Sequence, residues 1–179
     1  IVSTSIGQKI EAKCLVVAAG AGSFVPRKPP VENIDNFENI NVYYAIRDKA
    51  KFEGKELLIA GGGDSALDWT NELSKNSKVT LIHRRKEFRA APDSVSKMQE
   101  LEKNGKINFL QGQIKQINES KNNKIKIIYE KDGSTSVVEV DYLLPFFGLK
   151  MELGPIAEWG LNLHENLIKV DTEKFETST

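Results

Sequence analysis

The sequence predicts an α/β fold in which parallel strands alternate with helices, joined to an antiparallel β-meander. Two short apolar runs, residues 57–60 and 79–82, have the character of strands covered on both faces. Between them, residues 64–75 carry apolar side chains at helical spacing, as in a helical crossover between parallel strands. Further short apolar runs from residue 107 onward are separated by turn signals and predict the meander.

The composition suits one domain, or one domain with parts of a second. The chain has 179 residues, 40% of them hydrophobic, and its 25 basic and 25 acidic side chains balance. A balanced charge gives no general attraction to nucleic acid or to an anionic membrane, and no apolar run approaches the roughly 20 residues that span a bilayer. One cysteine and two histidines exclude an intrachain disulfide and a histidine-rich metal site, so no metal is expected. We expect a cytoplasmic protein and, because Ile1 is not a methionine, a segment of a longer one.

The first 30 residues are expected to lead into the main domain. Residues 1–20 fit two strands joined at Gly7, and the second of them, 13–19, is expected to be buried together with the Cys14 thiol. Three prolines between residues 26 and 30 favour an extended connector, so a domain boundary is expected between about Gly20 and Pro30. Residues 33–47 are ambiguous; 42–45 fit a short strand and 46–52 one helical turn.

A glycine turn separates the strand 57–60 from the helix that follows. Its pattern, Gly61-x-Gly63-x-x-Ala66, matches the GxGxxG/A sequence of dinucleotide-binding βαβ units. One glycine makes the tight turn, the second lets the backbone approach a pyrophosphate, and the small third residue lets the helix pack close to the strand. Free N–H groups at the helix start would then face the phosphates. The candidate binding residues of this turn are Gly61, Gly62, Gly63, Asp64, Ser65 and Ala66. The alternative is a turn without a ligand, since glycine turns also join strands to helices elsewhere.

The end of the second strand predicts which dinucleotide is bound. An NAD site has an Asp or Glu about 20 residues after the glycine turn, where it binds the ribose hydroxyls. This sequence instead has His83, Arg84 and Arg85, with Arg89 four residues later and no acid from 79 to 86. Guanidinium groups bind a 2′-phosphate through paired hydrogen bonds, so the pattern favours NADPH. The alternative is that these side chains form a solvated basic patch.

Three further side chains near the turn are expected to have structural roles. Asp64 is expected to cap the helix rather than to act in catalysis. The His83 ring is expected to pack near the adenosine rather than to transfer protons, and Trp69 to lie in the core rather than stack on a ligand. No residue stands out as a catalytic acid, base or nucleophile.

The remaining elements are predicted from periodicity and turn residues. A helix is expected at 94–103, and the meander is expected to have four strands, with turns at Asn122-Asn123 and Asp132-Gly133. A buried strand should end at Gly148, a short helix should begin at Gly154, and a polar end should follow. The expected ranges are 107–110, 114–117, 125–129 and 137–140 for the meander, 142–147 for the buried strand, 154–158 for the short helix, 167–170 for a last strand and 173–179 for the polar end.

Two motifs carry a family resemblance. GGGDSALDW at 61–69 and HRRKEFRA at 83–90 resemble the NADPH domain of thioredoxin-reductase-like flavoproteins, and more narrowly that of the thioredoxin-reductase-type ferredoxin–NADP+ reductases. Four other stretches, spread along most of the chain, agree with the resemblance: residues 22–28, 52–55, 146–148 and 154–161.

The resemblance implies a flavoprotein with two dinucleotide-binding domains, in which a Rossmann-like NADPH domain is inserted into an FAD domain. Residues 25–148 would be the NADPH domain, and 1–24 and 149–179 would be pieces of the FAD domain, with hinges near 20–24 and 147–150. The resemblance also implies a cofactor contact at Gly148. The parent enzyme would pass a hydride from NADPH to FAD and electrons on to ferredoxin or flavodoxin, commonly as a homodimer. The segment alone would bind NADP(H) without reductase activity.

Other functions remain open. Thioredoxin reductases have a CxxC motif just before the glycine motif, whereas residues 42–55 contain no cysteine, so dithiol chemistry is excluded within this chain. The NADPH domain of another thioredoxin-reductase-like flavoprotein and a stand-alone NADPH-binding module are both compatible with the motifs. Nucleic-acid binding through the arginines is disfavoured because the charge is balanced and aromatic residues are not interleaved with the basic ones.

Overall fold

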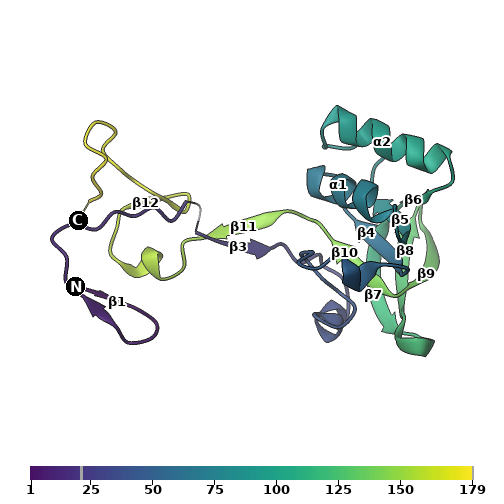
Figure 1. The fold of residues 1–179 in the computed structure, drawn as a ribbon, viewed down its shortest axis with the longest axis horizontal. Coiled ribbons are helices and arrows are strands. Elements are labelled where there is room, and N and C mark those ends of the chain that lie inside the picture. Colours follow the sequence, from purple (N-terminus) through teal and green to yellow (C-terminus); the bar gives the residue numbers. More distant parts are fainter. Residues whose placement is uncertain (21, 179) are drawn as a thin grey trace. The chain divides into compact units, whose positions relative to one another are not determined.

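The computed structural model describes residues 1–20 and 22–178, which form two compact units (Figure 1). Unit 1 comprises Ile1–Val25 and Lys150–Thr179, and unit 2 comprises Pro26–Leu149. The sequence-based boundaries lie one residue earlier, after residues 24 and 148. Ala21, within the expected first hinge, and Thr179, at the expected polar end, lie outside the described residues.

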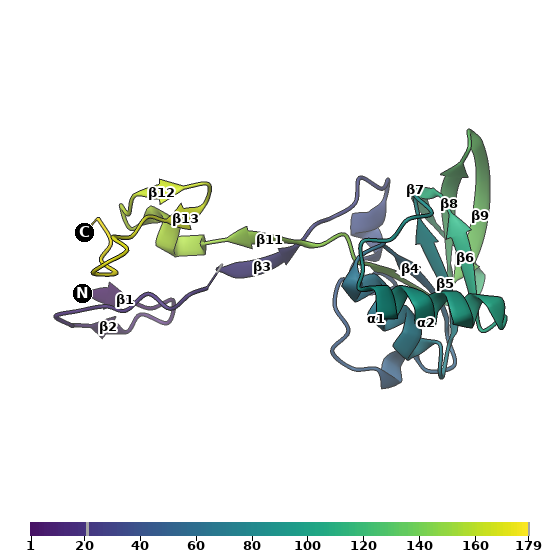
Figure 2. The same cartoon turned by 90° about the horizontal axis from the view of Figure 1, so that it is seen from above.

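Unit 2 is built on a four-stranded sheet in which all neighbouring strands are parallel, in the order β10-β4-β5-β6. Figure 2 labels β4, β5 and β6, and Figure 1 labels β10. Two successive βαβ crossovers build three of its strands, and a later strand returns beside the first. The carboxyl ends of all four strands therefore share one edge of the sheet. The elements are β4 (Glu56–Ala60), α1 (Asp64–Leu73), β5 (Lys78–His83), α2 (Pro92–Lys103), β6 (Ile107–Gln111) and β10 (Tyr142–Pro145).

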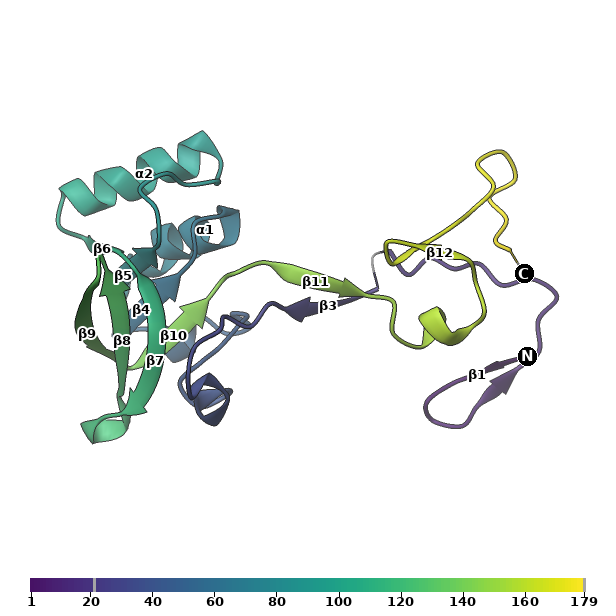
Figure 3. The ribbon, with the colours of Figure 1, turned by 180° about the vertical axis from the view of Figure 1, so that it is seen from behind.

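Alternate residues of β4 face opposite layers, as the strand pleat requires. Leu57 and Ile59 belong to the apolar cluster shared with α1 and α2, and Leu58 and Ala60 to the cluster shared with the meander. The helices and strands that form these layers are labelled in Figure 3. The meander consists of β7 (Gln113–Glu119), β8 (Ile125–Lys131) and β9 (Ser134–Val140). Because both faces of β4 are covered, its sequence is continuously apolar rather than alternating.

The meander has three strands rather than the four expected. Residues 107–110, expected to be its first strand, instead form β6, where Ile107 lies opposite Val79 of β5 in a parallel pairing. The reason is the helix α2 before it, because a strand–helix–strand crossover returns the chain to the same sheet. The two expected turns are present, with positive φ at Asn122, Asn123, Asp132 and Gly133.

The segment before β4 contains two short 3-10 helices, η1 (Ile34–Phe37) and η2 (Ala50–Phe52), whose phenylalanines are buried in the core. The strand considered at 42–45 is reduced to isolated bridges at Val42, one of which joins Leu143 of β10. A third 3-10 helix, η3 (Lys121–Asn123), links β7 to β8.

Unit 1 consists of short strands and turns. The turn at Gly7 joins an antiparallel pair, and a second antiparallel pair lies near the end of the chain. The short helix expected at 154–158 forms as a 3-10 helix, and the last expected strand is limited to two residues. The elements are β1 (Val2–Ser3), β2 (Lys9–Ile10), β3 (Ser23–Pro26), which pairs with β11 (Leu149–Glu152), η4 (Gly154–Glu158), β12 (Leu163–His164) and β13 (Leu167–Ile168).

The prediction of a buried strand at 13–19 is wrong. Leu15 and Val16 are 50% and 82% exposed, and the Cys14 thiol is exposed rather than packed. An apolar strand is buried only where another strand or layer covers it, and within the described residues no strand pairs with this segment. Sequence composition alone identified an apolar segment but did not reveal that no strand of the described residues pairs with it.

The described ranges lack two features, a membrane-spanning helix and a cluster of metal ligands. None of their helices combines the length and apolar character needed to cross a membrane. The same ranges contain no group of three or more His, Cys, Asp or Glu side chains arranged to hold a metal ion.

Candidate dinucleotide-binding site

The glycine turn and the arginine residues follow neighbouring strands at the same edge of the sheet. Gly61 follows β4 and Arg84 follows β5, and Ala60 lies opposite Ile82 in the pairing of these strands. β10 adjoins β4 on its other side and leads into Phe146 and Gly148. The chain order thus reverses at β4, and open α/β sheets bind ligands outside the carboxyl ends of the strands at such a point.

Gly61 allows three segments to approach one another closely. Its φ is +152°, and an added Cβ would lie 2.6 Å from the Phe146 carbonyl oxygen and 2.9 Å from the Ala66 Cβ. Phe146 also donates a 2.7 Å backbone hydrogen bond to Ala60, which fixes the segment after β10 beside the turn. The tight turn and the small residue at Ala66 are the packing features that the motif predicts.

The start of α1 presents four backbone donors that are free within the described part of the chain. Gly63 is the N-cap of α1, and the N–H groups of Gly62, Gly63, Asp64 and Ser65 form no hydrogen bond with any described residue. A Cβ on Gly63 would meet nothing within 4 Å, so the space above it is open. Unpaired N–H groups and the positive end of a helix dipole together suit a diphosphate.

Asp64 does not cap α1, so that expectation is wrong. The cap position is one residue earlier, and Asp64 is the first residue of the helix. Its Oδ1 atom instead accepts a 2.7 Å hydrogen bond from the backbone N–H of Ala91, at the start of α2. A carboxylate in the first turn of α1 is still favoured by the helix dipole.

Residues 84–91, termed the arginine loop, leave β5 and return to the glycine turn before α2 begins. The N–H of Arg89 donates a 2.7 Å hydrogen bond to the Gly62 carbonyl oxygen. The side chains of Arg84, Arg85 and Arg89 are exposed, and across residues 1–20 and 22–178 no ion pair involves any of them. Their guanidinium groups are therefore available to an anionic ligand.

His83 occupies the junction between β5 and the arginine loop. Its half-buried ring lies against Gly62 and stacks on Phe88, with ring centroids 5.5 Å apart and an interplanar angle of 28°. Burial, followed by the positive charge of Arg84, lowers the pKa of His83, and a hydrogen bond with the Glu87 backbone opposes this shift. The lowered pKa favours the neutral form of the ring.

Sequence reasoning missed two residues of this region. Phe88 lies inside a basic run, yet its ring packs between His83 and Phe109, 5.5 Å from each by ring centroids. An apolar residue within a charged stretch is a usable signal of such packing. Ala91 contributes only its backbone N–H, which leaves no signal in the sequence. The Trp69 side chain is half-buried and packs against the apolar cluster shared with α1 and α2, in agreement with the expected core role.

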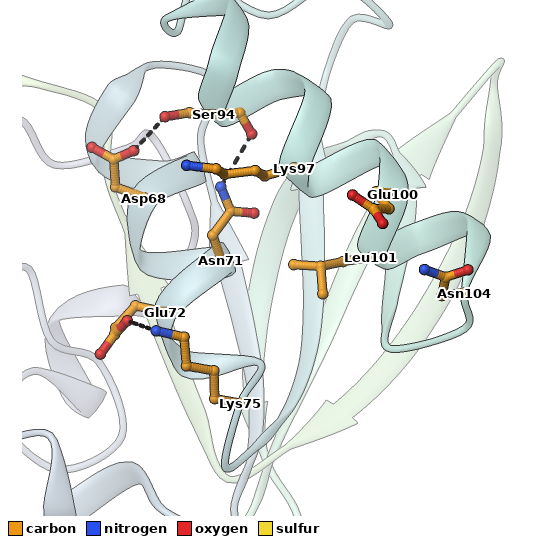
Figure 4. A pocket seen from close by; sticks show the side chains of 9 residues that line it. All are labelled: Asp68, Asn71, Glu72, Lys75, Ser94, Lys97, Glu100, Leu101 and Asn104. Atoms are coloured by element: carbon orange, nitrogen blue, oxygen red, sulfur yellow. Dashed lines mark hydrogen bonds and ion pairs between the residues drawn. The ribbon is translucent and has the colours of Figure 1, made fainter.

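A separate groove of about 530 Å³ lies between α1 and α2 (Figure 4). Ser94 donates to the Asp68 carboxylate at 2.7 Å, and the Asn71 amide donates to the Ser94 carbonyl oxygen at 3.1 Å, so polar contacts join the two helices there. No residue of the glycine turn or the arginine loop lines it. The lining residues, which carry both signs of charge, are Asp68, Asn71, Glu72, Lys75, Ser94, Lys97, Glu100, Leu101 and Asn104.

Known proteins match this chain over nearly its whole length. The profile of the pyridine nucleotide-disulphide oxidoreductase family matches residues 2–179. A ferredoxin–NADP reductase of Parvibaculum lavamentivorans is 53% identical over 180 residues, and one of Beijerinckia indica is 50% identical over 178 residues; each alignment covers 99% of this chain and 52% of the relative. The crystal structure of Lactococcus lactis thioredoxin reductase in its FR conformation aligns with a TM-score of 0.71 and 26% identity, over 88% of this chain and 52% of that one. The chain spans about half the length of the curated relatives it matches.

Proposed function

Because the chain belongs to the pyridine nucleotide-disulphide oxidoreductase family, we propose that unit 2 is the NADPH-binding domain of a flavin-dependent ferredoxin–NADP+ oxidoreductase. The relatives at 50% and 53% identity bear the name ferredoxin–NADP reductase. In the proposed parent enzyme, electrons pass between NADPH, FAD and ferredoxin or flavodoxin. We further propose that the parent enzyme is a homodimer and is located in the cytoplasm.

One structural observation carries the proposal: the free backbone donors at the glycine turn and the unpaired guanidinium groups of the next strand lie at the same edge of the sheet. The backbone bond from Arg89 to Gly62 ties the arginine loop to the turn. NADPH is elongated and carries negative charge at two positions, the diphosphate and the 2′-phosphate. It therefore suits both groups of donors at once. This juxtaposition also disfavours the two alternatives in which no cofactor is bound, namely a turn without a ligand and a solvated basic patch.

The residues present fit the proposed cofactor. The N–H groups from Gly62 to Ser65 would hold the diphosphate, and the open space above Gly63 leaves room for its approach. Gly148, which follows β10 with φ +86°, would let the backbone pass close to the cofactor at the switch point. When bound, NADPH supplies the hydride, and the domain's own part is to bind and orient the cofactor.

The arginine loop favours the phosphorylated cofactor over NADH. Arg84, Arg85 and Arg89 would bind the 2′-phosphate, and the neutral His83 ring would pack near the adenosine without adding or removing charge. A hydrogen bond to a charged group contributes roughly 1.5–3 kcal/mol, so two such bonds correspond to a preference of about two orders of magnitude or more.

We further propose that unit 1 belongs to the FAD domain of the parent enzyme. Its exposed apolar side chains support this, since isolated apolar segments are normally covered in a complete domain. Leu15, Val16, Trp159 and Leu167 are 50%, 82%, 43% and 56% exposed. The hinges would lie near residues 20–24 and 147–150, and domain rotation there would bring the nicotinamide to the flavin.

A second candidate in the same class is the NADPH domain of another thioredoxin-reductase-like flavoprotein. The likeness to Lactococcus lactis thioredoxin reductase supports the shared architecture. The absence of any cysteine from 42–55 argues against a dithiol in the position where thioredoxin reductases carry theirs. A third candidate, a stand-alone NADPH-binding module, would bind the cofactor without electron transfer.

The proposal is tested by comparing the purified chain with the FAD-loaded parent enzyme. The chain alone is expected to bind NADP+ but to show neither flavin absorbance nor NADPH-dependent dye reduction. The parent is expected to reduce ferredoxin with NADPH. Bound FAD with turnover in the chain alone would overturn the division into domains, and a parent that reduces a disulfide substrate but not ferredoxin would favour the second candidate.

A further inference from the structure

The arginine loop is attached to the glycine turn at two points. At one, the N–H of Arg89 donates to the Gly62 carbonyl oxygen at 2.7 Å. At the other, the N–H of Ala91 donates to the Asp64 carboxylate, also at 2.7 Å. The first bond joins two backbone groups, whereas the second needs the Asp64 carboxylate. Of these two bonds, a side-chain substitution can therefore remove only the second.

We propose that Asp64 is a positioning residue that holds the arginine loop against the glycine turn and so sets the preference for a 2′-phosphorylated dinucleotide. The inference rests on the proposed function, because it assumes that the loop's guanidinium groups bind the 2′-phosphate. The Asp64 carboxylate carries the wrong charge to bind phosphate, although the backbone N–H of Asp64 is one of the free donors at the turn. Its effect on the cofactor would act through Ala91 and the loop.

The rest of the loop is fixed by different contacts. The His83 ring lies against Gly62, and Phe88 packs between His83 and Phe109. These apolar contacts hold the first part of the loop whether or not Asp64 is present. The loss of the Asp64 carboxylate should therefore loosen the part around Arg89 and Ala91 and leave the fold of the sheet intact.

The proposed role of Asp64 requires its acceptor oxygen and not its negative charge. Asp64 lies in the first turn of α1, where a carboxylate is favoured by the helix dipole but repels an approaching diphosphate. Asparagine would offer the same acceptor oxygen without the charge. The positioning role therefore predicts that Asn preserves the cofactor preference, whereas a role of the charge itself predicts that it does not.

The same helix offers a matched control. Asp68, one turn further along α1, also accepts a 2.7 Å hydrogen bond from α2, in this case from the Ser94 hydroxyl. Its bond joins the two helices beyond the arginine loop, in the groove of Figure 4. Asp68→Ala removes a hydrogen bond of the same length to an Asp of the same helix without releasing the loop.

The experiment measures the dissociation constants of NADP+ and NAD+ by calorimetry for the full chain and for Asp64→Ala, Asp64→Asn and Asp68→Ala. In Asp64→Ala the preference for NADP+, expressed as the Kd of NAD+ divided by the Kd of NADP+, is expected to fall about fivefold or more, because a hydrogen bond to a charged acceptor is lost and NADP+ binding weakens. The ratio should return in Asp64→Asn and stay at the wild-type value in Asp68→Ala. An unchanged ratio in Asp64→Ala, or an equal fall in Asp64→Asn, would overturn the inference.

Two further measurements distinguish a failure of the proposed NADPH-binding function from a failure of the proposed role of Asp64. If the wild-type chain shows no preference for NADP+, the proposed function fails, and the role of Asp64 falls with it. If Asp64→Ala does not fold, amide hydrogen exchange in the wild type and in Asp64→Asn decides. The Ala91 N–H is expected to be protected in both, and rapid exchange at Ala91 in the wild type would contradict the attachment.

Discussion

The imidazole ring of His83 lies against Gly62 so closely that a Cβ added to this glycine would be 2.5 Å from the ring atoms Cε1 and Nε2. The end of β5 and the turn after β4 are thus in direct contact. No larger residue fits at Gly62 unless the ring moves, and Phe88, which stacks on the ring, restricts that movement.

Gly62→Ala is therefore expected to destabilise unit 2 by about 1–3 kcal/mol, the usual range for overpacking. It should also weaken NADP+ and NAD+ binding alike, because the diphosphate turn is displaced. Urea denaturation measures the first effect and calorimetry the second. If the ring contact is the cause, the double variant Gly62→Ala/His83→Ala should be more stable than the sum of the two single effects predicts. Strict additivity would show that the strain lies elsewhere.

Gly63→Ala should weaken dinucleotide binding without destabilising unit 2. The φ of Gly63 is −102°, which alanine adopts freely, and an added Cβ meets no atom within 4 Å. The stability should therefore stay within about 0.5 kcal/mol of the wild type. The methyl group would occupy the space left for the diphosphate, so both dinucleotides should bind at least about tenfold more weakly. Thermal unfolding and calorimetry on the same sample distinguish the two effects, and unchanged NADP+ affinity would contradict the assigned position of the diphosphate.

Arg84→Ala and Arg85→Ala should each weaken NADP+ binding at least about tenfold while barely changing NAD+ binding, because one charge-assisted hydrogen bond to the 2′-phosphate is lost. Lys126→Ala is a suitable control, since it removes one positive charge from an exposed position on β8. A parallel loss for both cofactors would mean that the arginines act on the structure of the loop.

Glu56 should make a pH-dependent contribution to stability. Its carboxylate pairs with the Lys124 and Lys78 ammonium groups, each at 2.7 Å, and these hydrogen bonds lower its pKa to about 2 from an ordinary value of 4.5. A lowered pKa stabilises the fold above pH 4.5, and this stabilisation is lost as the pH falls toward 2. Glu56→Gln should thus be less stable than the wild type at pH 7, with a difference that shrinks below about pH 4.5.

Chemical denaturation at pH 7, 5 and 3 tests this trend. Glu119→Gln, an exposed glutamate at the end of β7, controls for the removal of a negative charge. A difference between Glu56→Gln and the wild type that is constant across this range would rule out the ion pairs as its source.

The β4–α1–β5 unit could be predicted from sequence because its signals are local. The buried run at 57–60, the glycine turn and the apolar spacing after Asp64 each specify their own segment, and all three agree with one topology. The resemblance drawn from the motifs at 61–69 and 83–90 is confirmed by the family match and the similar curated proteins.

Long-range contacts account for the predictions that failed. Residues 107–110 have a strand pattern in either sheet, and only the crossover through α2 assigns them beside β5. The acceptor role of Asp64 depends on a backbone N–H 27 residues away in sequence. Segment 13–19 has the composition of a buried strand, but burial depends on a covering layer that local sequence does not encode.

The central claim is that the guanidinium groups of the arginine loop recognise a 2′-phosphate on a dinucleotide held at the glycine turn. Calorimetric titration of the wild-type chain with NADP+ and with NAD+, at equal ionic strength, tests it most directly. The account predicts heat on binding NADP+ and an affinity for it about two orders of magnitude higher than for NAD+. Equal affinities, or no binding of NADP+ at all, would contradict it.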